Sequence, residues 1–262
     1  MNSIIKSFFF VVLFIFMLAI FLSPIFVVLS NSLTTQTPSP RLSNYYAVFF
    51  DTDFLKSCIY SVFITIFSTA LIVFFSSMTA WMIIRVKNKL NKFFYYCFVF
   101  SAFVPFAALM WTMPKTAELA HLNNPIGIIL LYLGFGAGTS ILIFSAFIKK
   151  IPVEIEEAAL LDGCSPIQIF SNIVFPIIRP AVSIAALFNV IWIYNDYLMP
   201  NLIIGASGHK TIPMSIMGIG GSAASNIGIL SAAIILSIIP ILIFYIINRR
   251  NIIKTFSIGI PK

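Results

Sequence analysis

The sequence has few charged residues and almost no metal-ligating side chains. Asp, Glu, Lys and Arg make up 9% of its 262 residues, whereas a soluble domain usually carries about 25%. The three cysteines (Cys58, Cys97 and Cys164) lie far apart, and there are two histidines, His121 and His209. Because no Cys or His residues cluster with a ligand spacing, we expect no metal site.

Motifs for nucleotide binding and hydrolysis are also missing. The sequence has no GxxxxGK[ST] loop to cradle phosphates, no GxSxG and no HExxH. We therefore expect no enzyme activity and no cofactor in this chain. A net charge of +8 could suit nucleic acid, but the basic residues are spread between apolar runs. Without a basic patch that includes exposed aromatic residues, nucleic-acid binding is not expected.

Apolar residues are abundant instead, at 60% of the chain. A soluble fold could not bury this much apolar surface, so the expected solvent is lipid. Long uncharged apolar segments are predicted to be helices, because lone strands cannot satisfy their backbone groups in a bilayer. The sequence thus predicts an all-α membrane protein with six spans, roughly Phe8–Ser30, Ser57–Ile84, Phe93–Met113, Pro125–Ile148, Ile177–Gly205 and Ile227–Asn248.

The first apolar segment could be a cleaved signal peptide or a permanent span. A signal peptide has an apolar core of about 7–15 residues followed by a cleavage site with small residues. Residues 7–40 contain no charge, and Ser23–Leu29 stays apolar, which favours an uncleaved span. Most Lys and Arg residues then lie on the side of the N-terminus, which predicts that both termini are cytoplasmic.

Local signals mark several helix ends and bends. Asn124 followed by Pro125 is typical of a cap and a first helical turn. Prolines in or beside the predicted spans are expected to kink them, with neighbouring helices making the kinks tolerable; these are Pro24, Pro105, Pro180, Pro200 and Pro240.

One long loop, residues 149–179, separates the fourth and fifth predicted spans. It contains four of the eight acidic residues. Pro152 before a helical run and Gly163 after it indicate a short helix, and a turn then leads to a second short helix through Gln168 and Phe170. Such an acidic helix–turn–helix is either a docking surface for a cytoplasmic partner or an interfacial helix that caps the bundle. The physical signals alone favour neither.

The same loop resembles the EAA motif of permeases in binding-protein-dependent ABC importers. The matching residues are Glu157-Ala158-Ala159, then Gly163, then Ile173-x-Phe175-Pro176, with Phe175 where the family usually has Leu. The resemblance extends over most of the chain and is strongest to the shorter, maltose-type permease of carbohydrate importers. Further matching residues are Ile151-Pro152-x-Glu154, Asp162-Gly163 and Tyr194-Asn195-Asp196-Tyr197-Leu198-x-Pro200, and more weakly Gly259-Ile260-Pro261-Lys262.

The resemblance implies a mechanism and partners. The loop would be a coupling helix that fits a cleft on a separate ATP-binding subunit, so ATP and Mg²⁺ would be bound there and not by this chain. Glu157 would pair with a basic group of that subunit, and Gly163 would make the turn. The implied partners are two ATP-binding cassette subunits, a second homologous permease and an extracellular or periplasmic solute-binding protein. The implied coupling residues are Glu157, Ala158, Ala159, Asp162, Gly163 and Pro176.

The fifth predicted span is the most polar. Asn189, Trp192 and Asp196 would share one stripe of a continuous helix. An amide, an indole and a carboxylate suit a polar, ring-shaped solute, while hydrogen bonding between helices and an interfacial aromatic belt would explain the same residues. The candidates for the solute pathway are Asn189, Trp192, Tyr194, Asn195 and Asp196.

The sequence as a whole predicts a multi-pass permease subunit in a bacterial cell membrane that imports a carbohydrate or a related small polar solute. We expect a first span and outer loop over residues 1–54, a core of five spans over 55–250 and a cytoplasmic tail over 251–262. A secondary transporter or channel that works without an ATPase is the main alternative. An intramembrane enzyme would need a reactive polar cluster, and a purely structural protein would not need the motif.

Overall fold

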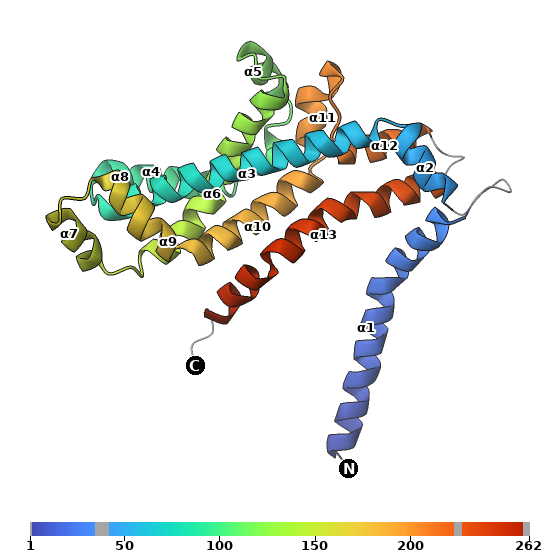
Figure 1. The fold of residues 1–262 in the computed structure, drawn as a ribbon, viewed down its shortest axis with the longest axis horizontal. Coiled ribbons are helices and arrows are strands. Elements are labelled where there is room, and N and C mark those ends of the chain that lie inside the picture. Colours follow the sequence, from blue (N-terminus) through green and yellow to red (C-terminus); the bar gives the residue numbers. More distant parts are fainter. Residues whose placement is uncertain (1, 35–41, 223–226, 259–262) are drawn as a thin grey trace. The chain divides into compact units, whose positions relative to one another are not determined.

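The computed structural model describes residues 2–34, 42–222 and 227–258, and within them every regular element is helical. The predicted all-α class is therefore confirmed (Figure 1). The tail residues 259–262 lie outside the described ranges. In chain order the elements are α1 (Asn2–Ser32), α2 (Ser43–Phe50), α3 (Phe54–Arg85), α4 (Lys89–Ser101), η1 (Phe106–Ala108), α5 (Met113–Leu119), α6 (Pro125–Ile148), α7 (Val153–Leu161), α8 (Pro166–Ile169), η2 (Phe170–Val174), α9 (Phe175–Ile177), α10 (Arg179–Asn195), α11 (Leu198–Ile204), η3 (Gly205–Ser207), α12 (Ile212–Ser222) and α13 (Ile227–Ile258).

Four of the described helices are long and apolar enough to cross a membrane. A fifth crossing is possible if the helical segments Pro166–Ile177 and Arg179–Asn195, which meet at a bend of 77°, act as one broken span. The described helices therefore support a multi-pass protein. The four long segments are Ser7–Ser32, Phe54–Arg85, Pro125–Ile148 and Ile227–Arg249.

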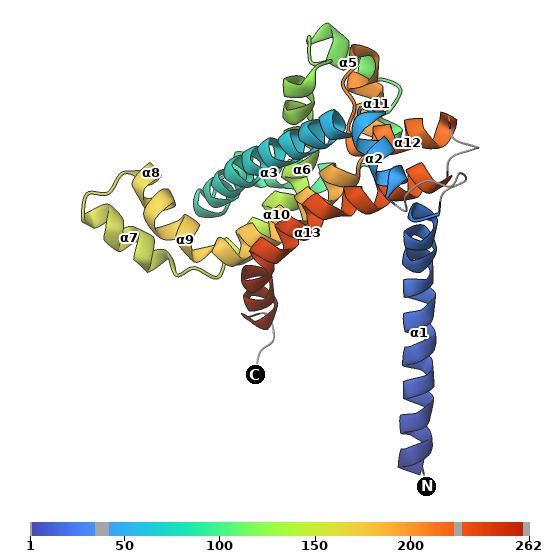
Figure 2. The ribbon, with the colours of Figure 1, turned by 45° about the vertical axis from the view of Figure 1, so that its right-hand side comes forward.

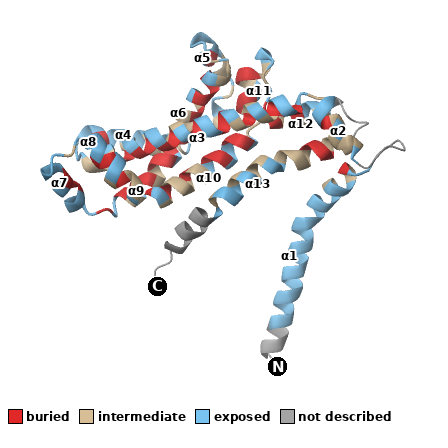
Figure 3. Ribbon diagram, viewed as in Figure 1, coloured by how far each residue is buried: buried red, intermediate tan, exposed pale blue. Residues whose placement is uncertain are grey.

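Contacts divide the chain into two units. The first comprises Met1–Lys56 and Met214–Ile239. Its α1 is exposed and apolar along most of its described length (Figure 3), as expected for a helix that faces lipid. The end of α1 is tied to α2, because Asn44 Nδ2 donates to the carbonyl oxygens of Ser32 and Thr34, each at 2.9 Å.

The second unit comprises Ser57–Pro213 and Pro240–Lys262, and α6 lies at its centre. Helices α4 and α10 both pack against α6, and two apolar clusters fill the space between the elements. The first cluster extends from α3 and α6 onto the loop helices α7 to α9. The second joins α3, α6 and α10 to the short helices α5 and α11, through buried residues such as Ile64, Tyr132 and Met199.

Two predicted spans are wrong as single helices. Phe93–Met113 was expected to be continuous, but α4 ends at Ser101, and Pro105 lies in an extended conformation just before η1. Ile177–Gly205 is also divided, because α10 ends at Asn195 and α11 begins at Leu198. The first of these segments has no charged residue, so composition alone does not reveal its break, whereas the second breaks at Asp196, the charged residue near its middle.

The other local predictions hold more closely. Helix α6 has the expected bounds, and Asn124 Oδ1 caps it by accepting from the backbone amides of Ile126 and Gly127 at 3.1 and 2.9 Å. Pro24 and Pro240 lie inside helices, as predicted. The other three prolines do not interrupt a long helix: Pro180 and Pro200 stand near the starts of α10 and α11, and Pro105 precedes η1.

The packing of α4 on α6 depends on a glycine. A Cβ at Gly138 would lie 2.6 Å from the carbonyl oxygen of Phe98 and 2.6 Å from Ser101 Oγ, whereas a Cβ at Gly134 would have no atom within 4 Å. Because a backbone carbonyl cannot move aside easily, Gly138→Ala should destabilise the fold by about 1–3 kcal/mol. Thermal unfolding in detergent should show a lowered midpoint for Gly138→Ala, while Gly134→Ala serves as the matched control. Equal midpoints would contradict this close approach.

Candidate functional site

The loop between α6 and α10 begins with a short acidic helix. Pro152 precedes α7, and Glu154 and Glu156 lie in the first turn of this helix. Negatively charged side chains at this end interact favourably with the helix dipole. Gly163 ends this part of the chain with a φ of +85°, a left-handed conformation that glycine adopts without steric cost. The predicted helix and turn are thus confirmed.

A second helical segment returns from this turn towards α10 (Figure 2). Ser165 and Gln168 form a reciprocal capping box at the start of α8, which satisfies two backbone amides that have no partner within the helix. A π-helical stretch, η2, follows and leads into α9, which contains Pro176. The chain then bends by 77° before α10. The helical segment Pro166–Ile177 therefore runs in a different direction from α10.

The outer side of α7 carries both an acid and large apolar groups. Glu157, Ala158 and Asp162 are exposed, and Leu161 is 89% exposed. Several exposed apolar side chains on one short segment are typical of a surface that a partner covers. Further exposed apolar side chains on this loop are Val153, Ile155, Leu160 and Ile167.

The inner side of α7 is held by a buried ion pair. Arg85 Nη2 and Nε lie 2.7 and 2.9 Å from Glu156 Oε1, and Trp81 Nε1 donates to Glu156 Oε2 at 2.8 Å. Arg85 Nη2 also donates to the carbonyl oxygens of Ile151 at 3.1 Å and Ile148 at 3.4 Å. The side chains of Arg85 and Glu156 are only 15% and 9% exposed. This Arg85 cluster, consisting of Trp81, Arg85 and Glu156, links the end of α3 to both the end of α6 and α7.

The sequence interpretation missed Glu156 and named both Ala158 and Ala159 as residues of the coupling surface. In the structure Ala159 is buried in this chain's own core, next to Glu156 on the helix, while Ala158 is exposed. The missed signal is the run of Glu residues at 154, 156 and 157, which cannot all face the same side of a helix. Its pairing with Arg85 joins residues 71 positions apart, and no local pattern reveals that.

A second candidate region is a cavity of about 340 Å³ between α4, α6 and α10. Asn189 and Trp192 both line it. Asn189 is buried, and its Nδ2 donates to Ser140 Oγ at 3.0 Å and to the carbonyl oxygen of Ala185 at 2.8 Å. Trp192 is 38% exposed and packs edge-on against Tyr132. The cavity therefore combines an aromatic face with an amide whose donors are already bound within the protein.

Asp196 does not share the predicted stripe, because α10 ends one residue before it. Its Oδ1 accepts from the backbone amides of Leu198 at 2.9 Å and Met199 at 3.3 Å, and its Oδ2 accepts from the Tyr132 hydroxyl at 2.9 Å. The carboxylate thus joins the end of α10, the start of α11 and the middle of α6. The predicted stripe is wrong because an Asp side chain that caps the next helix competes with continuing the first.

The remaining pathway candidates lie apart from this cavity. Tyr194 is buried and lines an apolar groove of about 620 Å³ between α3, α10 and α13. Asn195 is exposed, and its Nδ2 donates to the carbonyl oxygen of Ile191 at 2.7 Å. The structure therefore brings together Asn189 and Trp192 and separates both from Tyr194 and Asn195.

Residues 72–255 match the family of binding-protein-dependent transport system inner membrane components. A permease from Thermoanaerobacterium thermosulfurigenes, AmyC, described as a probable permease for starch degradation products, is 31% identical over 93% of this chain and 92% of its own. The Bacillus subtilis permease MelC, for melibiose, raffinose and stachyose import, is 26% identical over 79% of this chain and 76% of its own.

The fold is similar to that of a solved transporter chain. A chain in the crystal structure of a bacterial ABC transporter that imports alginate superimposes with a TM-score of 0.78, covering 95% of this chain and 97% of that one at 21% identity. The family match and the 31% identical relative thus define an importer permease, and the similar fold agrees with this class. The chain belongs to the binding-protein-dependent transport system inner membrane component family, and it is a multi-pass bacterial membrane protein.

Proposed function

We propose that this chain is the permease subunit of an ATP-driven importer for a carbohydrate or a related small polar solute. Family membership supports the transport role. The solutes of its relatives support the solute class, since they include starch degradation products, melibiose, raffinose and stachyose, and multiple sugars for Streptococcus mutans MsmG. Six spans with both termini in the cytoplasm would place residues 149–179 on the cytoplasmic side, as the distribution of basic residues favours.

The observation that carries the proposal is the two-sided construction of α7. Its inner side is fixed to α3 and α6 by the Arg85 cluster, while its outer side exposes Glu157 and Leu161. A partner that moves α7 would therefore move the ends of two long helices with it. Closure of an ATPase dimer would in this way turn the permease outward, and ATP hydrolysis would reset it.

The partners follow from this mechanism. ATP and Mg²⁺ would be bound by two ATP-binding cassette subunits beneath the loop, and this chain would perform no covalent chemistry. A second, homologous permease would complete the pore. A solute-binding protein would deliver the solute from outside; in a related alginate transporter structure, a periplasmic protein holds an alginate pentasaccharide. The cavity beside Asn189 and Trp192 is the part of this chain that we assign to the solute pathway.

Truncating the exposed leucine should weaken docking of the ATPase. Leu161 is 89% exposed on α7, so Leu161→Ser changes no internal packing. Removal of an apolar anchor from an interface costs about 1–2 kcal/mol or more, which corresponds to roughly tenfold weaker binding. Tagged protein extracted from its native membrane with mild detergent should then retain much less ATPase.

Leu119→Ser is the matched control, because Leu119 is 76% exposed but lies on α5, away from the loop. It should retain the ATPase and the second permease like the wild type. If Leu161→Ser and wild type retain equal amounts of ATPase, the docking assignment is wrong. If wild type purifies alone and moves solute without ATP, the chain is a secondary transporter or channel.

A further inference from the structure

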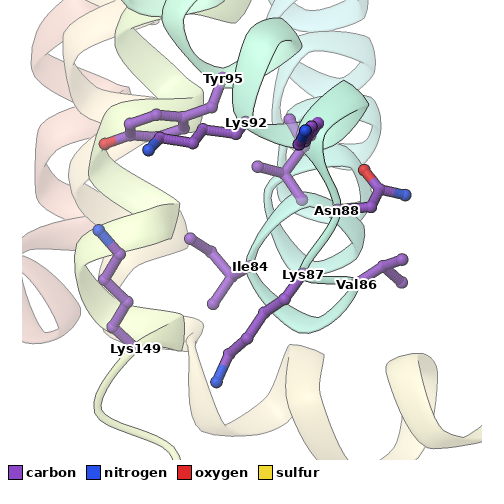
Figure 4. Close-up of a pocket in the computed structure, with 9 residues that line it drawn as sticks. Ile84, Val86, Lys87, Asn88, Lys92, Tyr95 and Lys149 are labelled. Atoms are coloured by element: carbon purple, nitrogen blue, oxygen red, sulfur yellow. The ribbon is translucent and has the colours of Figure 1, made fainter.

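A basic cavity lies at the junction of α3, α4 and α6, where the coupling loop begins, and it is separate from the solute cavity. It has a volume of about 520 Å³. Four lysines reach it from three places: Lys87 from the turn after α3, Lys89 and Lys92 from α4, and Lys149 from the end of α6. Figure 4 shows Lys92 and Lys149 extending towards Tyr95 from different elements, while Lys87 lies lower and extends away from Tyr95.

These four lysines have no acidic partner among the described residues. The ion pairs found there are Lys56 with Asp53 and Arg85 with Glu156. Lys149 instead lies over the ring of Tyr95, with its Nζ 5.4 Å from the centroid. Four positive charges around one cavity repel one another at close range, so an anion would be stabilised there.

The backbone adds to this preference. Asn88 and Lys89 line the cavity, and they form the N-terminus of α4, where Asn88 Oδ1 caps the amide of Asn91 at 2.6 Å. The N-terminus of a helix carries partial positive charge and favours anions, phosphate in particular. The lysines and the helix end therefore act in the same direction.

Part of the cavity lining is apolar, and this part decides which anion fits. Ile83, Ile84 and Val86 line the cavity, and Phe93 and Phe94, which follow Lys92 in α4, are exposed. Free phosphate makes no favourable contact with apolar side chains. A phospholipid, by contrast, carries its phosphate next to glycerol and acyl chains, which can contact them. Basic pockets between membrane helices at the cytoplasmic boundary are suited to such headgroups.

We propose that this cavity binds the headgroup phosphate of an anionic phospholipid, with Lys87, Lys92 and Lys149 contacting the phosphate and the isoleucines contacting the acyl chains. The lipid would lie between the ends of α3 and α6, both of which the Arg85 cluster also holds. The bound lipid would therefore stabilise the ends of α3 and α6, to which α7 is attached.

The test compares two double variants that each remove two positive charges, in the complete transporter purified from its own membranes. Lys87→Gln/Lys92→Gln changes the cavity. Lys115→Gln/Lys210→Gln changes exposed lysines elsewhere. After delipidation, each protein receives dioleoylphosphatidylglycerol or dioleoylphosphatidylcholine, and the bound lipid is counted by native mass spectrometry. A lysine near an anionic lipid surface contributes about fivefold in affinity, so the cavity variant should bind phosphatidylglycerol at least about tenfold more weakly, with the control unchanged.

Three results would overturn the proposal. Equal losses in both variants would indicate only a general effect of surface charge. Displacement of phosphatidylglycerol by millimolar inorganic phosphate would identify a site for the free ion. Protection of Lys87 and Lys92 from acetylation by a co-purified protein subunit, without bound lipid, would show that an acidic protein surface fills the cavity.

Discussion

Replacing Glu156 by Gln should uncouple ATP hydrolysis from transport while leaving the ATPase bound. The variant keeps an oxygen that can accept from Trp81 Nε1, but it leaves the guanidinium of Arg85 buried without its carboxylate. Breaking a buried ion pair in this way costs about 3 kcal/mol or more. Helix α7 would then be held less firmly to α3, so solute-stimulated ATP hydrolysis in proteoliposomes should fall close to the basal rate.

Glu154→Gln is the matched control for this prediction. Glu154 is on the same helix and loses the same charge, but it is exposed and takes no part in the Arg85 cluster. It should retain solute stimulation. Normal coupling in Glu156→Gln, despite a lowered unfolding temperature, would show that the ion pair serves stability alone.

The double variant Arg85→Met/Glu156→Gln separates stability from coupling. Removing both charges leaves no uncompensated ion, so much of the lost stability should return. The hydrogen bonds from Arg85 to α7 and to the carbonyl oxygens of Ile148 and Ile151 would still be missing, and only the bond from Trp81 Nε1 would join α3 to α7. We therefore expect a higher unfolding temperature than in Glu156→Gln, with coupling still absent; recovery of both would contradict the mechanical role.

The sequence predicts those parts of the fold that have local signals. Helix α6 could be bounded correctly because Asn124 and Pro125 mark its start by hydrogen bonding and ring geometry. Helix α7 and its turn could be recognised from Pro152 and Gly163 for the same reason. At these positions a backbone conformation depends on one side chain.

Composition does not reveal the break after Ser101 or the Arg85 cluster. Between Ser101 and Met113 the chain remains apolar although the helix has ended. A prediction of spans from hydropathy therefore cannot detect this break. The contact of Arg85 with Glu156 exists only because α3, α6 and α7 meet in three dimensions. Sequence reasoning therefore located the exposed side of α7 but not the contacts that hold its inner side.

The contacts of Asp196 with α6 could not be predicted from the sequence either. Replacing this residue should have a large effect on both transport and stability. Both carboxylate oxygens are used within the protein: Oδ1 by the amides of Leu198 and Met199, and Oδ2 by the Tyr132 hydroxyl. Asp196→Ala would leave these donors without a partner, at about 1–3 kcal/mol for each that is buried. We expect a fall in transport of tenfold or more, together with a lower unfolding temperature.

Asp196→Asn is the informative comparison, because it removes the charge but keeps an oxygen for the α11 amides and a partner for Tyr132. If Asp196 acts as the joint between α6, α10 and α11, the Asn variant should keep most of the stability and transport that the Ala variant loses. Tyr132→Phe, which removes one of the three hydrogen bonds, should be intermediate in stability. A different outcome would assign the charge itself to the solute: Asp196→Asn would then be stable but would raise the solute concentration needed for half-maximal transport. Measuring unfolding and solute dependence on the same three variants separates a joint that holds the helices from a carboxylate that binds the solute.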